Sequence, residues 1–284
     1  MYPPPAYPPP PPPGPGRAGN QNEGLIIIAV LIAILIVAVG SLGVLLVLIA
    51  HRAPARSASA TPKPSPGPVS RTTQLTASSG DVVFMDDFHN PATGWNTVSG
   101  AADVTYAYSN GTYVVVAKGN YNYYSPAPYY LRPQQISAST TATLDAHAPS
   151  DAGFGIDCDR GAAESLVTYE FTADADGRWS VEKAIGDSAS TIPTTLVGGS
   201  LGSAAAPGTT PVTLVGICAT QADGQTTRLV FFIDGKKVTD ITDNTATSSG
   251  RGWAADLVTS ASDSGPVTVT VSRFELRDLS RSGP

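Results

Sequence analysis

Four carboxylates in the C-terminal part of the chain are of a type that could act on a glycosidic bond. Asp157 and Asp159 flank Cys158, and Glu170 and Glu182 follow in two further apolar segments. Hydrolysis of such a bond needs two carboxyl groups roughly 5–10 Å apart. Side chains alternate between the two faces of a strand, so a core-facing Cys158 would turn both aspartates toward water. We therefore interpret the aspartates as solvated acids and the glutamates as single acids on outward strand positions, and we predict no catalytic residue.

A second group of candidate residues is aromatic and lies upstream of these acids. Five tyrosines lie within ten residues, namely Tyr121, Tyr123, Tyr124, Tyr129 and Tyr130. They are mixed with Asn120, Asn122, Pro126 and Pro128. Aromatic rings stack on the apolar faces of sugars, while Asn and Tyr side chains form hydrogen bonds with polar groups. We interpret the segment as a loop that binds a glycan or a protein. The alternative is a Tyr- and Pro-rich connection that packs over the end of a sheet.

The same residues offer little for a metal ion or a nucleophile. Asp174-Ala175-Asp176-Gly177 lacks the further acidic positions and the bidentate glutamate of an EF-hand loop, so we expect a hairpin turn there. His89 and His147 are too scattered to indicate a metal centre or a catalytic triad, and no serine lies in a G-x-S-x-G motif. The sequence therefore predicts no metal site from these residues.

The chain contains two cysteines, Cys158 and Cys218. Neither belongs to a C-x-x-C pair, and no His or Cys stands at zinc-binding spacing from either. We interpret them as a buried disulfide, with two buried free thiols as the alternative. A disulfide would place the domain in an oxidising compartment.

The elements that must position these residues are strands. Polar and apolar residues alternate through most of residues 81–279, and no segment shows a helical stripe of useful length. Ser109-Asn110-Gly111 predicts a hairpin, because Asn-Gly tolerates the positive φ angles of a type I′ turn, and Gly235-Lys236 is expected to form another turn. Roughly ten to fourteen short strands predict an all-β, two-sheet antiparallel sandwich. Trp95, Trp179 and Trp253 are expected to pack in or beside its core.

Several of these segments resemble one family of sandwich domains. They are Asp86-Asp87-Phe88 with Gly94-Trp95, and residues 153–158, 169–171, 176–179, 229–235 and 269–276. Together they are similar to the concanavalin A-like (laminin-G-like) jelly-roll domains found behind a membrane span in high-GC Gram-positive bacteria. The resemblance implies a jelly-roll sandwich, a disulfide between Cys158 and Cys218 on adjacent strands, and loops that in related domains often bind one calcium ion. Hydrolytic relatives carry carboxylates along one strand in a pattern like E-x-D-x-x-E, which this sequence lacks.

Ahead of the domain, the sequence predicts one transmembrane helix over residues 24–50. Residues 25–50 read LIIIAVLIAILIVAVGSLGVLLVLIA without a charged side chain, and about 20 apolar residues are enough to cross a bilayer. A signal peptide has a shorter apolar region and a basic start, and a buried core helix would carry regular polar positions. Ala29 and Ala33, with small residues near the far end, permit a weak dimer through the span.

The remaining boundaries follow from composition. Residues 1–23 form a disordered Pro-rich tail, residues 51–79 an Ala/Ser/Thr/Pro-rich stalk, residues 80–280 the sandwich domain and residues 281–284 a short C-terminal tail. More Lys and Arg residues follow the span than precede it, which by itself would place the domain in the cytoplasm. The stalk and the interpreted disulfide favour the opposite orientation, and long domains translocate largely regardless of flanking charge. We expect a cytoplasmic tail and an extracellular domain.

Charge and motifs together narrow the function. Residues 1–80 carry five basic side chains against Glu23, whereas residues 81–284 carry 12 basic and 22 acidic side chains. An acidic domain repels phosphate backbones, so we predict no nucleic-acid partner. The sequence predicts a membrane-anchored, non-enzymatic domain that binds a cell-envelope glycan or a surface protein. The alternatives are a glycoside hydrolase or lyase of the same fold, and a sensor ectodomain that signals through the span.

Overall fold

A computed structural model describes residues 74–101, 103–161, 165–186, 193–202, 206–245 and 252–281. The expected Pro-rich tail and membrane helix, and the stalk up to residue 73, lie outside these residues. Within the described part of the chain, no helix is long and apolar enough to cross a bilayer. The predicted span therefore stays a prediction from the sequence.

The described residues form fourteen strands and two short 3-10 helices. One group of strands is β1 (Asp81–Asp86), β2 (Val104–Ser109), β3 (Thr112–Ala117), β5 (Gln135–Leu144), β10 (Val212–Thr220), β11 (Thr227–Ile233), β12 (Lys236–Asp243) and β14 (Val267–Asp278). The other group is β4 (Asn122–Pro126), β6 (Gly153–Arg160), β7 (Val167–Asp174), β8 (Arg178–Ile185), β9 (Thr194–Ser200) and β13 (Asp256–Ser260). The 3-10 helices are η1 (Pro91–Thr93) and η4 (Leu279–Arg281).

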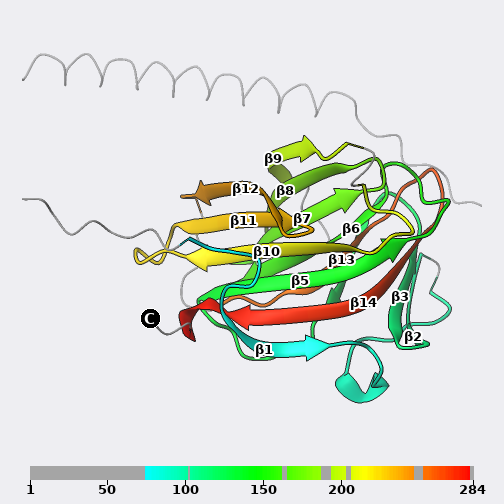
Figure 1. Cartoon of the computed structure of the whole chain (residues 1–284), viewed down its shortest axis with the longest axis horizontal. Helices are drawn as coiled ribbons and strands as arrows, with labels where there is room; N and C mark the ends of the chain where they lie inside the picture. Colours follow the sequence, from blue (N-terminus) through cyan, green and yellow to red (C-terminus); the bar gives the residue numbers. More distant parts are fainter. Residues whose placement is uncertain are drawn as a thin grey trace, which may run out of the picture. The chain divides into compact units, whose positions relative to one another are not determined.

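These strands form two antiparallel sheets packed face to face (Figure 1). The eight-stranded sheet, called sheet A here, has the order β12-β11-β10-β5-β14-β3-β2, and β1 pairs with the far end of β14. The six-stranded sheet, called sheet B, has the order β4-β13-β6-β7-β8-β9. The predicted all-β, two-sheet antiparallel sandwich is confirmed for the described residues.

Turn chemistry explains where several strands end. Asn110 (φ 51°) and Gly111 (φ 74°) join β2 to β3, which confirms the predicted hairpin. The turn between β11 and β12 has its positive φ angles at Asp234 (48°) and Gly235 (75°). It lies one residue earlier than expected, because Lys236 already pairs with Ile233 in the sheet.

The core lies between the two sheets and is closed by a disulfide. Cys158 of β6 and Cys218 of β10 are bonded, with their Cα atoms 6.4 Å apart. The two strands belong to different sheets, so the expectation of a bridge between adjacent strands is wrong. Alternation turns both cysteines inward, and the inner faces of opposite sheets meet there. Trp95 and Trp253 are buried and Trp179 packs against the core, as expected.

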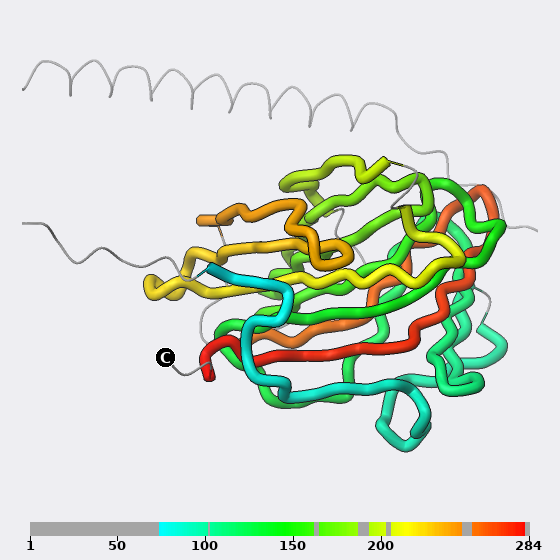
Figure 2. The backbone as a smooth tube through the Cα atoms, in the orientation of Figure 1, coloured from blue at the N-terminus to red at the C-terminus, as the bar shows by residue number. Residues whose placement is uncertain are grey.

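Sheet A is apolar on part of its outer face as well. Val215, Ile217, Val230 and Phe232 of β10 and β11 point away from the sandwich core and are nevertheless buried. Leu75 and Ala77 pack against them, and Figure 2 shows this segment crossing β10 before it enters β1. The last residues of the expected stalk are therefore part of the folded domain's surface layer.

Candidate functional site

Four carboxylates stand side by side across the outer face of sheet B. Asp157 of β6 is directly opposite Glu170 of β7, and Glu170 is opposite Glu182 of β8. On the other side, the pairing of Leu257 with Ile156 places Asp256 of β13 opposite Asp157. We call Asp256, Asp157, Glu170 and Glu182 the acidic row. Neighbouring strands are about 4.8 Å apart, so each carboxylate has another acid as its closest cross-strand neighbour.

The local sequence explains why the row faces outward. Cys158 and Tyr169 are core residues of β6 and β7, so alternation sends Asp157 and Glu170 to the opposite face. The neighbouring position Gly155 has no side chain, and an added Cβ would lie 2.2 Å from the carbonyl oxygen of Phe171. In the same cross-strand line, Tyr124 of β4 is paired with Val258, which is paired with Gly155. Gly155 therefore permits a close approach of the β7 backbone, and Tyr124 of the outer strand β4 reaches Glu170 of β7.

Hydrogen bonds hold the row in place. Tyr124 donates its hydroxyl to Glu170 Oε1, and the Asn122 Nδ2 group donates to Glu170 Oε2, both over 2.6 Å. The backbone N–H of Asp256 donates to Asp157 Oδ1 over 2.9 Å. At the open end of the row, Thr195 donates to Glu182 Oε1 over 3.1 Å. A carboxylate with fixed donors keeps its orientation, which is a property of a prepared binding surface.

The acids of the row are far less exposed than the sequence suggested. Asp157 and Glu170 are each 1% exposed, whereas Glu182 and Asp159 are half-buried. The expectation that Asp157 is solvated is therefore wrong, Asp159 is only partly exposed, and Glu170 is not an open surface acid. Their direction, away from Cys158, agrees with the expectation. For Glu170 the difference arises because Asn122 and Tyr124 of β4 reach across the face to its carboxylate.

Burial changes the proton affinity of these groups. It raises the pKa of Asp157 well above its usual range, and the charges of Asp159 and Asp256 add to the effect. Burial likewise raises the pKa of Asp256 to about 8. The pKa of Glu170 is raised by burial, although the hydrogen bonds from Tyr124 and Asn122 oppose the shift. Adjacent carboxyls with differing environments are a common feature of sites that transfer protons or bind cations.

Within the face, three aspartates converge most closely. Carboxylate oxygens of Asp157, Asp159 and Asp256 lie within 4.8 Å of one another. Thr168 donates to Asp159 Oδ1 over 2.7 Å and fixes its orientation. This trio was not predictable from the sequence, because Asp256 lies about one hundred residues after Asp157 and reaches its neighbours only through strand pairing. We call these three residues the aspartate trio.

The structure distributes the five candidate tyrosines over several environments. Tyr123 and Tyr129 pack against the sandwich core, and the Tyr123 hydroxyl donates to the Lys118 carbonyl. Tyr124 belongs to the acidic face. Tyr121 is 69% exposed and Tyr130 is 92% exposed. The assignment of the five tyrosines to ligand binding stays a prediction, and Tyr124 is the member that contacts the acidic row.

The other candidate acids and histidines have local roles. The Asp174–Gly177 segment forms the predicted hairpin turn, in which the Gly177 N–H donates to the Asp174 carbonyl. His89 contacts Asp87 on the surface. Inside the sandwich, Lys183 forms a buried 2.6 Å ion pair with Asp243, to which the Tyr169 hydroxyl also donates. The sequence does not predict this buried pair, because Asp243 lies in a polar segment that is typical of an exposed turn.

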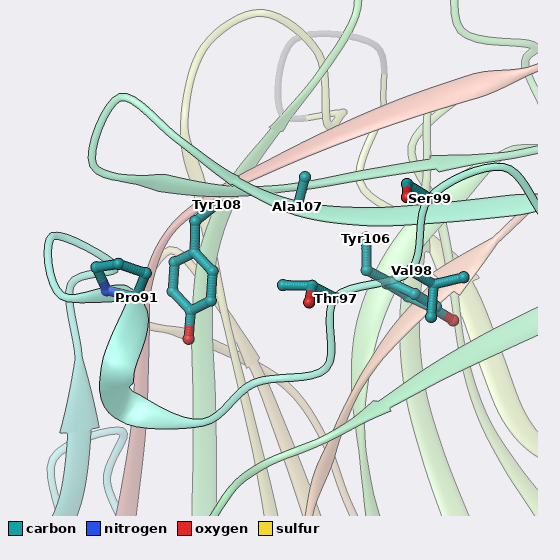
Figure 3. Close-up of a pocket in the computed structure, with 7 residues that line it drawn as sticks. All are labelled: Pro91, Thr97, Val98, Ser99, Tyr106, Ala107 and Tyr108. Carbon is teal, nitrogen blue, oxygen red and sulfur yellow. The ribbon is translucent and has the colours of Figure 1, made fainter.

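A shallow hollow of about 350 Å³ lies beside β2, away from the acidic row (Figure 3). Its lining residues are Pro91, Thr97, Val98, Ser99, Tyr106, Ala107 and Tyr108. The Tyr108 hydroxyl is already used by Thr93 and by the backbone N–H of Trp95. No acid or histidine is among the lining residues, so this hollow offers no group for acid–base chemistry.

Comparisons with known proteins give similarity only to solved structures. No family model matches the chain, and no curated protein sequence matches it. The solved structures include the alginate lyase Aly36B (13% identity, 68% of this chain and 95% of that chain, TM-score 0.47). They also include an endo-β-1,4-glucuronan lyase from the fungus Trichoderma reesei (10% identity, 69% of this chain and 95% of that chain, TM-score 0.48). A third is the potassium-bound carbohydrate recognition domain of Emp46p (12% identity, 65% of this chain and 88% of that chain, TM-score 0.45). Likeness of this degree carries no information about the substrate or chemistry of this chain.

Proposed function

We propose that this chain is a membrane-anchored, extracytoplasmic glycan-binding protein, and that the glycan contacts the outer face of sheet B. The observation that carries the proposal is the acidic row, four carboxylates on four adjacent strands. The membrane anchor and the extracellular position are the expectations from residues 24–50 and the stalk. The disulfide supports an oxidising compartment.

An acidic row is costly for a sheet to maintain. Like charges directly opposite each other destabilise a sheet. At about 5 Å and an effective dielectric constant near 20, two ionised carboxylates repel by roughly 3 kcal/mol. A feature that opposes stability is typical of a functional surface, because a packed apolar or mixed-charge row would fold better. Glycan hydroxyl groups donate hydrogen bonds to carboxylates and would use this arrangement.

The surroundings of the row indicate which glycans fit. The face contributes negative charge and acceptor groups, which favour neutral or amino-bearing sugars and disfavour uronic acids and phosphates. Glu182 and Asp159 are half-buried and remain reachable. Tyr130 offers an exposed ring on the loop that also carries Arg132, whose charge acts on Asp159 and Asp256. An exposed aromatic ring is suited to stacking on a sugar.

The test is retention of the full chain, purified in mild detergent, on immobilised neutral, amino-sugar and uronic-acid glycans. We expect retention on one of the first two classes. Glu182→Gln should weaken it by about tenfold or more, because it removes a charge-assisted hydrogen bond. Tyr130→Ala should weaken it about five- to tenfold through lost stacking. Asp81→Asn, which neutralises an exposed acid on β1 of sheet A, is the matched control and should leave retention unchanged.

Two results would contradict the proposal. One is retention by uronic-acid glycans alone, since the acidic face would repel them. The other is equal retention by the wild type and the Glu182→Gln and Tyr130→Ala variants, which would place binding elsewhere.

A second candidate function is glycoside hydrolysis, which one observation favours. Glu170 and Glu182 are cross-strand neighbours, and strand spacing is close to the roughly 5–5.5 Å carboxyl separation of retaining glycosidases. The raised pKa of Glu170 suits a proton donor. The test is whether the protein releases reducing ends from the same glycan panel and whether Glu170→Gln abolishes this release. If both occur, hydrolysis and not binding is the function.

A further inference from the structure

The outer face of sheet A carries an apolar patch on two adjacent strands. Val215 and Ile217 of β10 lie directly opposite Phe232 and Val230 of β11, so the four side chains are contiguous. Each residue is at most 5% exposed, although its side chain points away from the sandwich core. A sheet that faces water on one side alternates apolar and polar residues, whereas strands that are covered on both faces are almost continuously apolar. The sequences of β10 and β11 therefore require a cover on this face.

The cover is a short segment at the point where the chain enters the domain. Residues 74–80, called the strap here, cross β10 ahead of β1 (Figure 2). Leu75 and Ala77 pack against the patch and are half-buried, whereas Thr76 and Ser78 are exposed. The strap belongs to neither sheet. It therefore covers the patch through alternate side chains and not through a ladder of backbone hydrogen bonds.

The two ends of the strap are held differently. At the downstream end, the Arg277 Nη1 group donates to the carbonyls of Ser78 (3.2 Å) and Gly80 (3.0 Å). Gly80 has a φ of 93°, and an added Cβ would lie 2.9 Å from the side chain of Leu279, so glycine lets the chain turn close to η4. The upstream end is held on the patch by the side chain of Leu75. We expect this end to lift first, because local opening is easiest where few buried contacts hold a segment.

We propose that the patch is a self-association surface for a second copy of this chain, and that the strap closes it. This inference goes beyond glycan binding and does not depend on it. Two sheets with apolar faces pack against each other about 10 Å apart. A second copy supplies an identical patch, and a two-fold axis brings the two patches together as one interface.

The size of the patch indicates how strong this association is. Four side chains of this kind offer roughly 250–500 Å² of apolar surface. A stable dimer buries about 800 Å² on each partner. The open patch therefore supports a weak, reversible dimer, which a short strap can suppress. A shared membrane, as expected from residues 24–50, would raise the effective concentration of the copies and favour such a dimer.

The strap and a second copy compete for the same side chains. The apparent affinity of self-association is the intrinsic affinity reduced by the fraction of chains whose patch is open. Release of the strap therefore tightens association without any change in the interface itself. A pull on the chain ahead of Leu75 would have this effect, so the stalk would control association of the domain.

The test measures self-association of the full chain by sedimentation velocity, in mild detergent and without glycan. Leu75→Asp places a charge against the patch and should release the strap, so we expect association at least about tenfold tighter than in the wild type. Arg277→Gln removes the donor to the Ser78 and Gly80 carbonyls and should also tighten association, without an added charge. Ser78→Asp is the matched control, because it adds the same charge at an exposed strap position, and it should stay within about twofold of the wild type.

A double variant shows whether the patch itself is the interface. Val215→Lys, added to Leu75→Asp, places a charge within the patch and should return association to the wild-type level. Tryptophan fluorescence reports whether each protein is folded, and Ala77→Asp or Phe232→Lys replaces a strap or patch variant that is not. Association through the predicted span is common to all these proteins and cancels in the comparison.

Three results would overturn the proposal. The first is that Leu75→Asp and Arg277→Gln associate as the wild type does. The second is that Ser78→Asp associates as tightly as Leu75→Asp, and the third is that the double variant remains associated. Because no glycan is present, these outcomes leave the glycan test unaffected.

Discussion

Neutralising one member of the acidic row should stabilise the protein. Asp157 stands between Glu170 and Asp256 on neighbouring strands. In Asp157→Asn the side chain keeps its size, and Oδ1 still accepts the 2.9 Å hydrogen bond from the Asp256 N–H. The substitution therefore removes a buried ionisable group and leaves the local packing and this hydrogen bond in place.

The size of the effect follows from the repulsion that is removed. Each ionised neighbour at about 5 Å contributes roughly 3 kcal/mol at an effective dielectric constant near 20. Part of this repulsion is already relieved at neutral pH by protons bound to the row, because burial raises the pKa of Asp157 and Asp256. We expect a net gain of about 1–3 kcal/mol in the free energy of unfolding. At a urea m-value of about 2 kcal/mol/M, the midpoint rises by roughly 0.5–1.5 M.

The assay is urea unfolding of the full chain in EDTA at pH 7, followed by tryptophan fluorescence. All three tryptophans, Trp95, Trp179 and Trp253, pack in or against the sandwich core, so their emission reports on this domain. Asp81→Asn is the control and should leave the midpoint unchanged. Asp157→Ala removes the acceptor for the Asp256 N–H, so its urea midpoint should rise less than that of Asp157→Asn. A lower midpoint for Asp157→Asn than for the wild type would refute the reasoning.

Three further predictions concern stability. Replacing both Cys158 and Cys218 by Ala should lower the free energy of unfolding by about 4 kcal/mol, because the disulfide spans 60 residues; an unchanged urea midpoint would contradict this. Lys183→Met should cost about 3–5 kcal/mol, because it leaves Asp243 buried without its cation, and a loss below about 1 kcal/mol in the same assay would show that water already reaches the pair. Burial raises the pKa of Asp174 to about 7, so the native state holds this proton more tightly than the unfolded chain. The resulting stability is present below about pH 4 and is lost as pH rises to about 7. As pH rises from 4 to 7, the free energy of unfolding of Asp174→Asn should therefore increase relative to that of the wild type, by at most about 4 kcal/mol. The prediction is contradicted if the urea midpoint changes equally in both proteins between pH 4 and pH 7.

The fold was largely predictable because its signals are local. A period of two marks the strands, and Asn110-Gly111 marks a hairpin. The inward direction of Cys158 and the outward direction of Asp157 also follow from alternation alone. The pairing of the two cysteines across different sheets did not follow, because strand order in a sandwich depends on long-range contacts that alternation does not specify.

The candidate site was predictable only in part, for the same reason. Asp157, Asp159, Glu170 and Glu182 were recognised as acids on strands, yet their assembly depends on the register between β6, β7 and β8. Asp256 joins them from β13, about one hundred residues downstream of Asp157. Alternation also predicts too much exposure for Glu170, because the outer face of a strand is expected to be open to solvent, whereas Tyr124 reaches across this face to Glu170.

Binding of a neutral or amino-bearing glycan to the outer face of sheet B is best tested by retention of the wild type and Glu182→Gln side by side on those two glycan classes. Both proteins are the full chain in mild detergent, and released reducing ends are measured in the same samples. We predict that the wild type is retained, that Glu182→Gln binds about tenfold more weakly or worse, and that no reducing ends appear. Equal retention of both proteins, or retention of neither, would contradict glycan binding at the acidic row.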